Sequence, residues 1–200
     1  MTRVKMCGMT SEGDVINANE LKPDYIGFVF ANNSRRFVAP QRAQELKKLL
    51  DKDIKAVGVF VDEDIETVLA LIMDGTIDIA QLHGNEDDDY ITLLRERTGK
   101  PVIKAFRIRS EQDVLRAEKS KADMILLDAG AGDGKTFDWS LLKEIKRPYF
   151  LAGGLNPENA ADAVKALKPY AVDVSTGIET NGVKDREKMT AFADAVRKEE

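Results

Sequence analysis

Residues 149–157 read Tyr-Phe-Leu-Ala-Gly-Gly-Leu-Asn-Pro, and residues 172–177 read Val-Asp-Val-Ser-Thr-Gly. Each segment is predicted to be a short strand that runs into small residues, where backbone N–H groups can approach an anion because no Cβ stands in the way. Asn156 is a good N-cap and Pro157 suits the first position of a helix, whose positive end would face the same anion. A tight turn alone would explain one glycine pair, but two such turns after consecutive strands predict a phosphate-binding site. The residues expected to bind phosphate are Gly153, Gly154, Ser175, Thr176 and Gly177.

Short β-branched or apolar runs recur along the chain, and most are continuously hydrophobic, as strands buried on both faces are. They begin near Arg3, Tyr25, Lys55, Asp78, Pro101, Asp123, Pro148 and Ala171. Amphipathic helical patterns lie between them, and the clearest is formed by Ile65, Val68, Leu69 and Ile72. Eight strands that alternate with helices predict an α/β fold, namely a single-domain (βα)8 TIM barrel of eight parallel strands that spans residues 1–200.

Helix start signals agree with this placement. Ser110 lies three residues before Asp113, as in a capping box, and Asp138 precedes an apolar helical pattern that starts at Trp139. The alternative is an open, doubly wound sheet, which often carries a glycine fingerprint after its first strand. Residues 7–10 read Cys-Gly-Met-Thr and lack that fingerprint, whereas polar or small candidates follow many of the strands. This distribution favours a barrel, whose sites are assembled from several loops at the carboxyl ends of the strands.

The composition excludes several classes of protein. A chain of 200 residues with 43% hydrophobic residues suits one core, and its formal charge of -5 provides no basic face for nucleic acid. No apolar run reaches the ~18 residues of a membrane span, and the N-terminus lacks a signal peptide, so we expect a cytoplasmic protein without nucleic-acid or membrane partners. Cys7 and His83 are the only cysteine and histidine, which excludes cysteine-rich and histidine-rich metal sites. We expect no metal and no cofactor, and the charged helix faces favour a monomer.

Two residues at strand ends are candidates for acid–base chemistry. Cys7 precedes a helix start at Thr10 or Ser11, and a helix N-terminus pointing at the thiol would lower its pKa and favour a general base. A buried apolar role is the more common one for an isolated cysteine. Asp128 ends the apolar run 124–128, where desolvation would raise its pKa and suit a general acid, unless it only caps the next loop. Placed together at a barrel mouth, the two residues favour acid–base catalysis.

Two basic residues each admit two interpretations. Arg36 follows the second strand, and its planar guanidinium suits a carboxylate, although a solvated basic pair with Arg35 would explain it as well. Lys104 lies within the predicted strand 101–106 and is either the Schiff-base lysine of an aldolase or an ion-pair partner that points into the barrel. A phosphate-metabolite binding protein without turnover is a third possible function.

Nine motifs follow one another at the predicted strand ends. They are Lys-Met-Cys-Gly-Met-Thr at 5–10, Gly-Phe-Val-Phe at 27–30, Ser-Arg-Arg at 34–36, Gly-Val-Phe at 58–60, Gln-Leu-His-Gly at 81–84, Leu-Leu-Asp at 126–128, Gly-Lys-Thr-Phe-Asp-Trp at 134–139, Leu-Ala-Gly-Gly-Leu at 151–155 and Asp-Val-Ser-Thr-Gly-Ile-Glu at 173–179. In this order the chain resembles the phosphoribosylanthranilate isomerase family from end to end. It departs from the family pattern at Thr176, where a serine is usual, and at Asp133, which adds negative charge to the loop after the sixth strand.

The resemblance implies a reaction and a role for each candidate residue. The reaction is the Amadori rearrangement of N-(5-phosphoribosyl)anthranilate to 1-(2-carboxyphenylamino)-1-deoxyribulose 5-phosphate in tryptophan biosynthesis, without a cofactor. Asp128 would protonate the furanose ring oxygen as general acid, and Cys7 would then remove the C2′ proton as general base. Arg36 would bind the anthranilate carboxylate, and His83 and Asp173 would line the substrate pocket.

Overall fold

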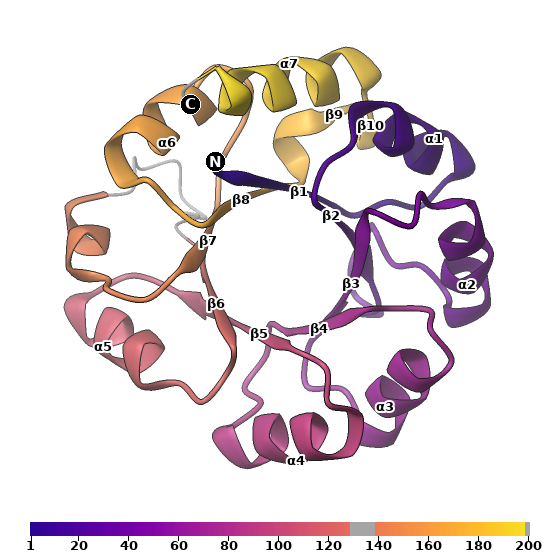
Figure 1. The fold of residues 1–200 in the computed structure, drawn as a ribbon, viewed down its shortest axis with the longest axis vertical. Helices are drawn as coiled ribbons and strands as arrows, with labels where there is room; N and C mark the ends of the chain where they lie inside the picture. Colours follow the sequence, from indigo (N-terminus) through magenta and orange to yellow (C-terminus); the bar gives the residue numbers. More distant parts are fainter. Residues whose placement is uncertain (129–138, 199–200) are drawn as a thin grey trace.

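Eight parallel strands form a closed barrel in the computed structural model of the chain, which describes residues 1–128 and 139–198. Each strand pairs with the next along the chain, and the barrel closes where β1 pairs with β8, with Lys5 opposite Asp173 (Figure 1). The strands are β1 (Arg3–Cys7), β2 (Tyr25–Val29), β3 (Lys55–Phe60), β4 (Ile79–Leu82), β5 (Val102–Arg107), β6 (Met124–Asp128), β7 (Tyr149–Ala152) and β8 (Ala171–Val174). The predicted TIM barrel is therefore confirmed, with every strand starting within one residue of its predicted start.

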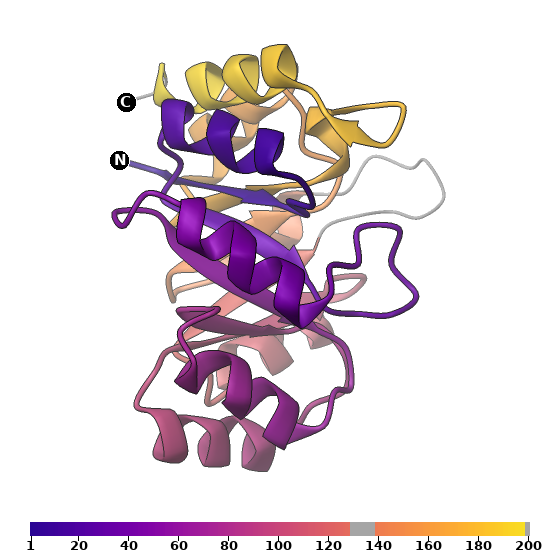
Figure 2. The same ribbon diagram turned by 90° about the vertical axis from the view of Figure 1, so that its right-hand side faces the viewer.

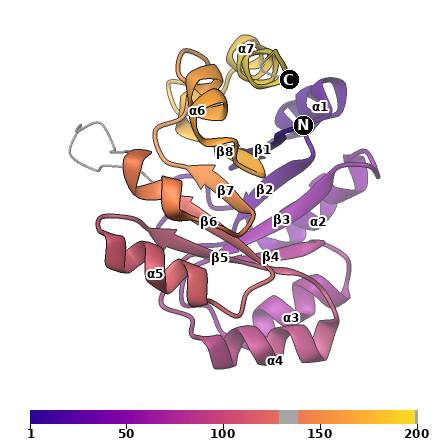
Figure 3. The ribbon, with the colours of Figure 1, turned by 60° about the vertical axis from the view of Figure 1, so that its left-hand side comes forward.

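Helices form a ring around this barrel (Figure 1). They are α1 (Glu12–Leu21), α2 (Pro40–Leu49), α3 (Ile65–Met73), α4 (Asp88–Thr98), α5 (Glu111–Lys119), the 3-10 helix η1 (Trp139–Glu144), α6 (Ala160–Leu167) and α7 (Arg186–Arg197). Figure 3 shows η1 beside α5 in this ring, and the two elements are in contact. No helix within the described residues is both long enough and apolar enough to cross a membrane.

Side chains alternate between the two faces of each strand and so build two separate apolar clusters. On β1, Val4 and Met6 belong to the larger cluster, which lies between the barrel and the helices. The smaller cluster fills the barrel lumen and consists of Tyr25, Val57, Ile79, Ile103, Ala105, Leu126, Phe150, Ala152 and Ala171. By this alternation Lys5 and Cys7 point into the lumen, and the lumen cluster forms the floor beneath the carboxyl ends of the strands.

Local signals fix most helix starts. The predicted capping box is present at α5, where a carboxylate oxygen of Asp113 accepts from the Ser110 N–H at 3.0 Å and from the Ser110 hydroxyl at 2.9 Å. The prediction that α6 starts at Pro157 is wrong, because α6 begins at Ala160. Asn156 does accept from the N–H of Asn159 at 3.0 Å, but the Asn159 side chain bonds back to Asn156 N at 2.9 Å and Gly154 O at 3.0 Å. These local bonds, with the backbone bond from Ala160 N to Asn156 O at 3.1 Å, hold residues 157–159 in a turn before α6.

The segment between β6 and β7 differs from the predicted α-helix. Its described part is the 3-10 helix η1, which ends shortly before Pro148, a residue that disfavours helical conformation at Arg147. The predicted helix start at Asp138, the charge at Asp133 and most of the motif at 134–139 lie outside the described residues.

A small antiparallel hairpin follows β8 and was not predicted. It consists of β9 (Glu179–Thr180) and β10 (Val183–Lys184), preceded by the 3-10 helix η2 (Thr176–Ile178). Figure 2 shows the hairpin and the loop after β2 projecting from the same end of the barrel. This end is the one at which the β strands finish.

Candidate active site

A cavity of about 320 Å³ opens at the carboxyl ends of the strands. It receives side chains or backbone from β1, the loop after β2, β4, β6, β7 and β8. All of the residues predicted for the site line it: Cys7, Arg36, His83, Asp128, Gly153, Gly154, Asp173, Ser175, Thr176 and Gly177. The fold therefore brings together residues as far apart in the sequence as Cys7 and Gly177.

Cys7 is buried at the floor of this cavity, with 8% of its surface exposed. Burial raises the pKa of its thiol, and the ammonium groups of Lys5 and Lys184 offset this only in part, while Asp173 raises it further. The prediction that a helix N-terminus lowers this pKa is therefore wrong. The N–H groups at the start of α1 are already bonded: Asp14 accepts from Ser11 N at 3.1 Å, and Ser11 Oγ accepts from Asp14 N at 3.2 Å.

A buried ion pair lies next to Cys7 in the lumen. Lys5 is fully buried, and its Nζ lies 2.9 Å from Oδ1 of Asp173 on the neighbouring strand β8. Burial disfavours the ammonium form, but the charges of Asp173 and Cys7 raise the pKa of Lys5 above its usual value. These charges therefore favour the ammonium form of Lys5 beneath the cavity.

His83 and Asp128 face each other on the opposite wall. His83 Nε2 lies 3.7 Å from Asp128 Oδ2, and His83 Nδ1 lies 3.1 Å from the amide nitrogen of Gln81. If that amide donates to Nδ1, the imidazole proton is on Nε2 and points toward Asp128. Gln81 is 1% exposed, and its Oε1 has no hydrogen-bond partner in the described part of the chain. The raised pKa of Asp128 stays a prediction.

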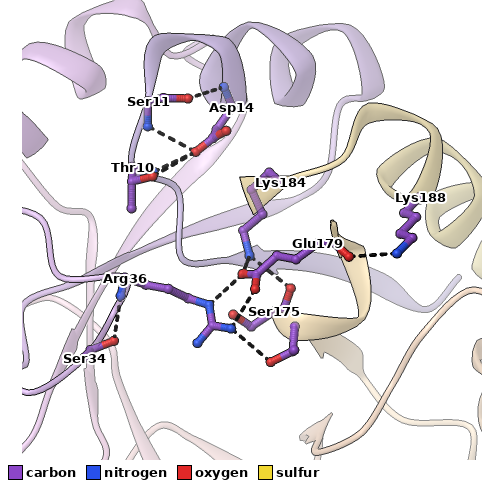
Figure 4. A network of polar contacts seen from close by, with 10 residues as sticks. Thr10, Ser11, Asp14, Ser34, Arg36, Ser175, Glu179, Lys184 and Lys188 are labelled. Atoms are coloured by element: carbon purple, nitrogen blue, oxygen red, sulfur yellow. Dashed lines mark hydrogen bonds and ion pairs between the residues drawn. The ribbon is translucent and has the colours of Figure 1, made fainter. Parts of the chain in front are cut away.

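Arg36 does not project into solvent as one half of a basic pair. Its Nε and Nη2 donate to the two carboxylate oxygens of Glu179 at 2.6 and 2.8 Å, and Nη2 also lies 3.1 Å from Thr176 Oγ1 (Figure 4). Lys184 donates to the same carboxylate at 2.7 Å and to the Ser175 carbonyl at 3.0 Å. The solvated-pair interpretation is therefore wrong for Arg36, while Arg35 is exposed. Because Glu179 occupies one edge of the guanidinium, Nη1 is the nitrogen left for a ligand.

Acid should weaken the fold through Glu179, whose side chain is 5% exposed. Burial alone would raise its pKa, but hydrogen bonds and charges from Arg36 and Lys184 lower the pKa of Glu179 from 4.5 to about 2. A lowered carboxyl pKa contributes stability that is complete above the unfolded value and is lost as pH falls toward the folded one, here roughly 3 kcal/mol. We expect Glu179→Gln to flatten the decline of unfolding free energy between pH 5 and pH 2, measured by urea titration. An unchanged acid limb would contradict this.

The turns after β7 and β8, which are predicted to bind an anion, lie side by side at the rim of the cavity. Gly154 has φ +69, and a Cβ built on it would meet no atom within 4 Å, so its outer side is open to the cavity. A Cβ on Gly177 would overlap the carbonyl oxygen of Leu155, which explains why glycine allows the two turns to approach each other. Within the described residues, the N–H groups of Gly153, Gly154 and Gly177 donate to no protein acceptor. Such N–H groups are suited to a phosphate.

Lys104 lies away from the lumen. Its neighbours Ile103 and Ala105 belong to the lumen cluster, so Lys104 faces the helices, and the expectation that it points into the barrel is wrong. Its Nζ donates to Glu86 at 2.8 Å and to the carbonyl of Gly84 at 2.7 Å. The ion-pair interpretation is confirmed, and a lysine so engaged is poorly placed to attack a carbonyl at the cavity.

Four residues around the cavity carry polar contacts that sequence reasoning did not identify: Lys5, Gln81, Glu179 and Lys184. The sequence could have indicated the first two by their spacing. Lys5 lies two positions before Cys7, and Gln81 lies two positions before His83, so each shares a strand face with a predicted site residue. Glu179 and Lys184 have no such signal, because their role depends on a short hairpin that folds back beside β1.

Comparisons with known proteins identify the family of the chain. Residues 4–195 match the family model of N-(5'phosphoribosyl)anthranilate (PRA) isomerase. The chain is 49% identical over 202 residues to the N-(5'-phosphoribosyl)anthranilate isomerase of Endomicrobium trichonymphae, covering 98% of this chain and 99% of that protein. It is 44% identical over 204 residues to that of a Thermoanaerobacter species, covering 98% of each.

Solved structures give the same result. The phosphoribosyl anthranilate isomerase of Thermotoga maritima superposes with a TM-score of 0.92 at 37% identity, covering 99% of this chain and 100% of that one. A second isomerase structure, a complex with reduced 1-(o-carboxyphenylamino)-1-deoxyribulose 5-phosphate, superposes with a TM-score of 0.89, again covering 99% of this chain and 100% of that one. By the family model and by full-length identity, the chain belongs to the phosphoribosylanthranilate isomerase family.

Proposed function

We propose that this chain catalyses the Amadori rearrangement of N-(5-phosphoribosyl)anthranilate with Asp128 as general acid and Cys7 as general base. One observation carries the proposal: a carboxyl and a thiol line the same cavity, and N–H groups at its rim donate to no acceptor among the described residues, which suits them to a phosphate. Family membership supports the substrate, and the geometry supports the two roles.

The first step opens the sugar ring. Asp128 gives its proton to the furanose ring oxygen, the bond between that oxygen and C1′ breaks, and the nitrogen lone pair forms the C1′=N⁺ double bond of a Schiff base. Asp128 is left as a carboxylate, and His83 Nε2, 3.7 Å away, is placed to stabilise the new charge. His83 thus stabilises the negative charge that this step leaves on Asp128.

The second step moves a proton from carbon. The Cys7 thiolate removes the C2′ proton, and the electrons of the C2′–H bond form C1′=C2′ and neutralise the iminium nitrogen. The resulting enolamine is protonated at C1′ and loses its hydroxyl proton, which yields the ketone at C2′. The proton taken up at C1′ equals the one lost from the C2′ hydroxyl. Cys7 then releases its proton to solvent and Asp128 takes one up, which restores both residues for the next turnover.

Two anchors orient the substrate between these residues. The phosphate is bound by the N–H groups of Gly153, Gly154 and Gly177, with Ser175 and Thr176 beside them. Arg36 binds the anthranilate carboxylate through Nη1, because Glu179 fixes its opposite edge. His83 and Asp173 complete the wall of the pocket.

The direct test is the conversion of N-(5-phosphoribosyl)anthranilate by the purified chain, followed by the loss of anthranilate fluorescence. The expected result is saturable turnover that persists after treatment with a metal chelator. Binding of the substrate without turnover would show instead a metabolite-binding protein and would contradict the proposal.

The exchange of Arg36 for methionine should affect both binding and stability. We expect a loss of ~1.5–3 kcal/mol in substrate binding, seen in KM, because the charge-assisted hydrogen bond to the carboxylate is removed. The variant should also lose roughly 1–3 kcal/mol of unfolding free energy, because buried Glu179 keeps only Lys184 as a partner. Arg35→Met is the matched control in the same loop and should change neither quantity. Equal effects of the two exchanges would contradict the assignment.

We further propose that the chain acts in the cytoplasm as a monomer. Its 32% charged residues support a well-solvated surface. Light scattering should give the mass of one chain, 22.2 kDa, at micromolar concentration. A mass twice as large would contradict the monomer.

A further inference from the structure

The barrel lumen contains a lysine that the proposed reaction does not use. Lumens of this fold are filled mainly by apolar side chains, and the floor of the lumen here is apolar as well. Lys5 departs from it, because its side chain is fully buried against Asp173. A buried ion pair contributes little net stability compared with apolar residues of similar volume, so stability is a weak explanation for this one.

We propose that Lys5 is a positioning residue for Cys7: its ammonium group, fixed by Asp173, stabilises the thiolate that removes the substrate proton. The inference rests on the role proposed above for Cys7 and adds to it the source of the thiolate. Lys5 itself is fully buried and does not line the cavity, so it acts on the reaction through Cys7.

The positions of the two residues support this role. Lys5 and Cys7 lie two residues apart on β1 and point to the same side of the strand. The register places Lys5 directly opposite Asp173, which lines the cavity together with Cys7. Among the groups near the thiol, Lys5 lowers the pKa of Cys7 more strongly than Asp173 raises it.

The charges around the Cys7 thiol also support the proposed role of Lys5. Three cations interact with Cys7: Lys5, Lys184 and Arg36. Lys5 pairs with Asp173, whereas Lys184 and Arg36 both pair with Glu179, as Figure 4 shows. His83 and Asp128 face the cavity from the opposite wall. The three cations favour the thiolate of Cys7, although burial keeps the pKa of the thiol above its usual value. Loss of Lys5 removes one of these three positive charges.

The sequence offers a clean probe, because Cys7 is the only cysteine. The rate of alkylation by iodoacetamide, measured across pH on the whole chain, reports the pKa of this thiol without any need for turnover. We expect Lys5→Met to shift the alkylation profile upward by about one pH unit or more, which is about a tenfold slower rate at a fixed pH below the pKa. The pH profile of kcat/KM should shift in the same direction.

A double variant covers the case in which the single exchange prevents folding. Lys5→Met combined with Asp173→Asn removes both charges, so that no unpaired carboxylate stays in the lumen. Its alkylation profile should also shift upward, by less than that of the single variant, because the lost ammonium outweighs the lost carboxylate at the thiol. Lys104→Met is the matched control: it also removes a buried strand lysine from an ion pair, but on the helix-facing side of β5, and should leave the profile unchanged.

The outcomes separate this inference from the proposed function. A wild-type alkylation profile in the folded single or double variant would overturn the role of Lys5, whatever the activity of Cys7 variants. An equal shift in Lys104→Met would overturn it too, since the effect would then be general. Full activity of Cys7→Ala would remove Cys7 as the base, yet the alkylation profile would still measure whether Lys5 stabilises its thiolate.

Discussion

Cys7→Ser is expected to lower kcat by roughly 10²-fold or more while the fold stays intact, because a hydroxyl is a far weaker base than a thiol and positioned proton transfer contributes ~10²–10⁴. The serine is close in size to the cysteine, so the packing around this buried position changes little. Asp128→Asn should cause a loss of similar size, since an amide cannot give a proton to the ring oxygen. Both losses are measured as kcat at saturating N-(5-phosphoribosyl)anthranilate.

A control separates lost chemistry from lost binding. Both variants keep the turns after β7 and β8, so inorganic phosphate should still raise their melting temperatures as it does that of the unaltered chain. If either variant keeps near wild-type kcat with substrate saturating, that residue has no part in proton transfer.

Gly154→Asp is expected to abolish the stabilisation of the fold by phosphate. The side chain would extend into the open space beside Gly154 and place a negative charge where the anion binds. Inorganic phosphate or ribose 5-phosphate should raise the melting temperature of the unaltered chain, because a ligand that binds only the folded state stabilises it by RT ln(1 + [L]/Kd). The variant should show no such rise.

Gly154→Asn is the matched control for this exchange. Asparagine tolerates the left-handed conformation at φ +69 about as well as aspartate and has nearly the same shape, but it is neutral. It should therefore retain part of the phosphate effect. A folded Gly154→Asp chain that responds to phosphate as the unaltered chain does would move the phosphate site elsewhere.

Much of the fold was accessible from the sequence because its determinants are local. Continuous apolar runs specify buried parallel strands, and the helical spacing of Ile65, Val68, Leu69 and Ile72 specifies the face that α3 buries. The start of α6 was not accessible, because it depends on side-chain bonds between Asn156 and Asn159 that compete with the helix. The hairpin after β8 is only a few residues long and leaves no periodic pattern.

The candidate site was accessible for a different reason. In a parallel barrel every strand ends at the same rim, so a polar residue at a strand end can be assigned to one cavity without knowing any contact. The pKa of Cys7 was not accessible, since it depends on burial and on charges from β8 and the hairpin. Nor was the Arg36–Glu179 pair, which joins residues 143 positions apart in the sequence.

If Cys7 removes the proton from C2′, its replacement must slow the release of a hydrogen isotope from that carbon. Substrate tritiated at C2′ is mixed with excess enzyme, and tritium in water is measured through a single turnover for the unaltered chain and for Cys7→Ala. We expect the variant to bind the substrate but to release tritium at least ~10²-fold more slowly. Release at the rate of the unaltered chain would contradict the assignment of Cys7 as the base.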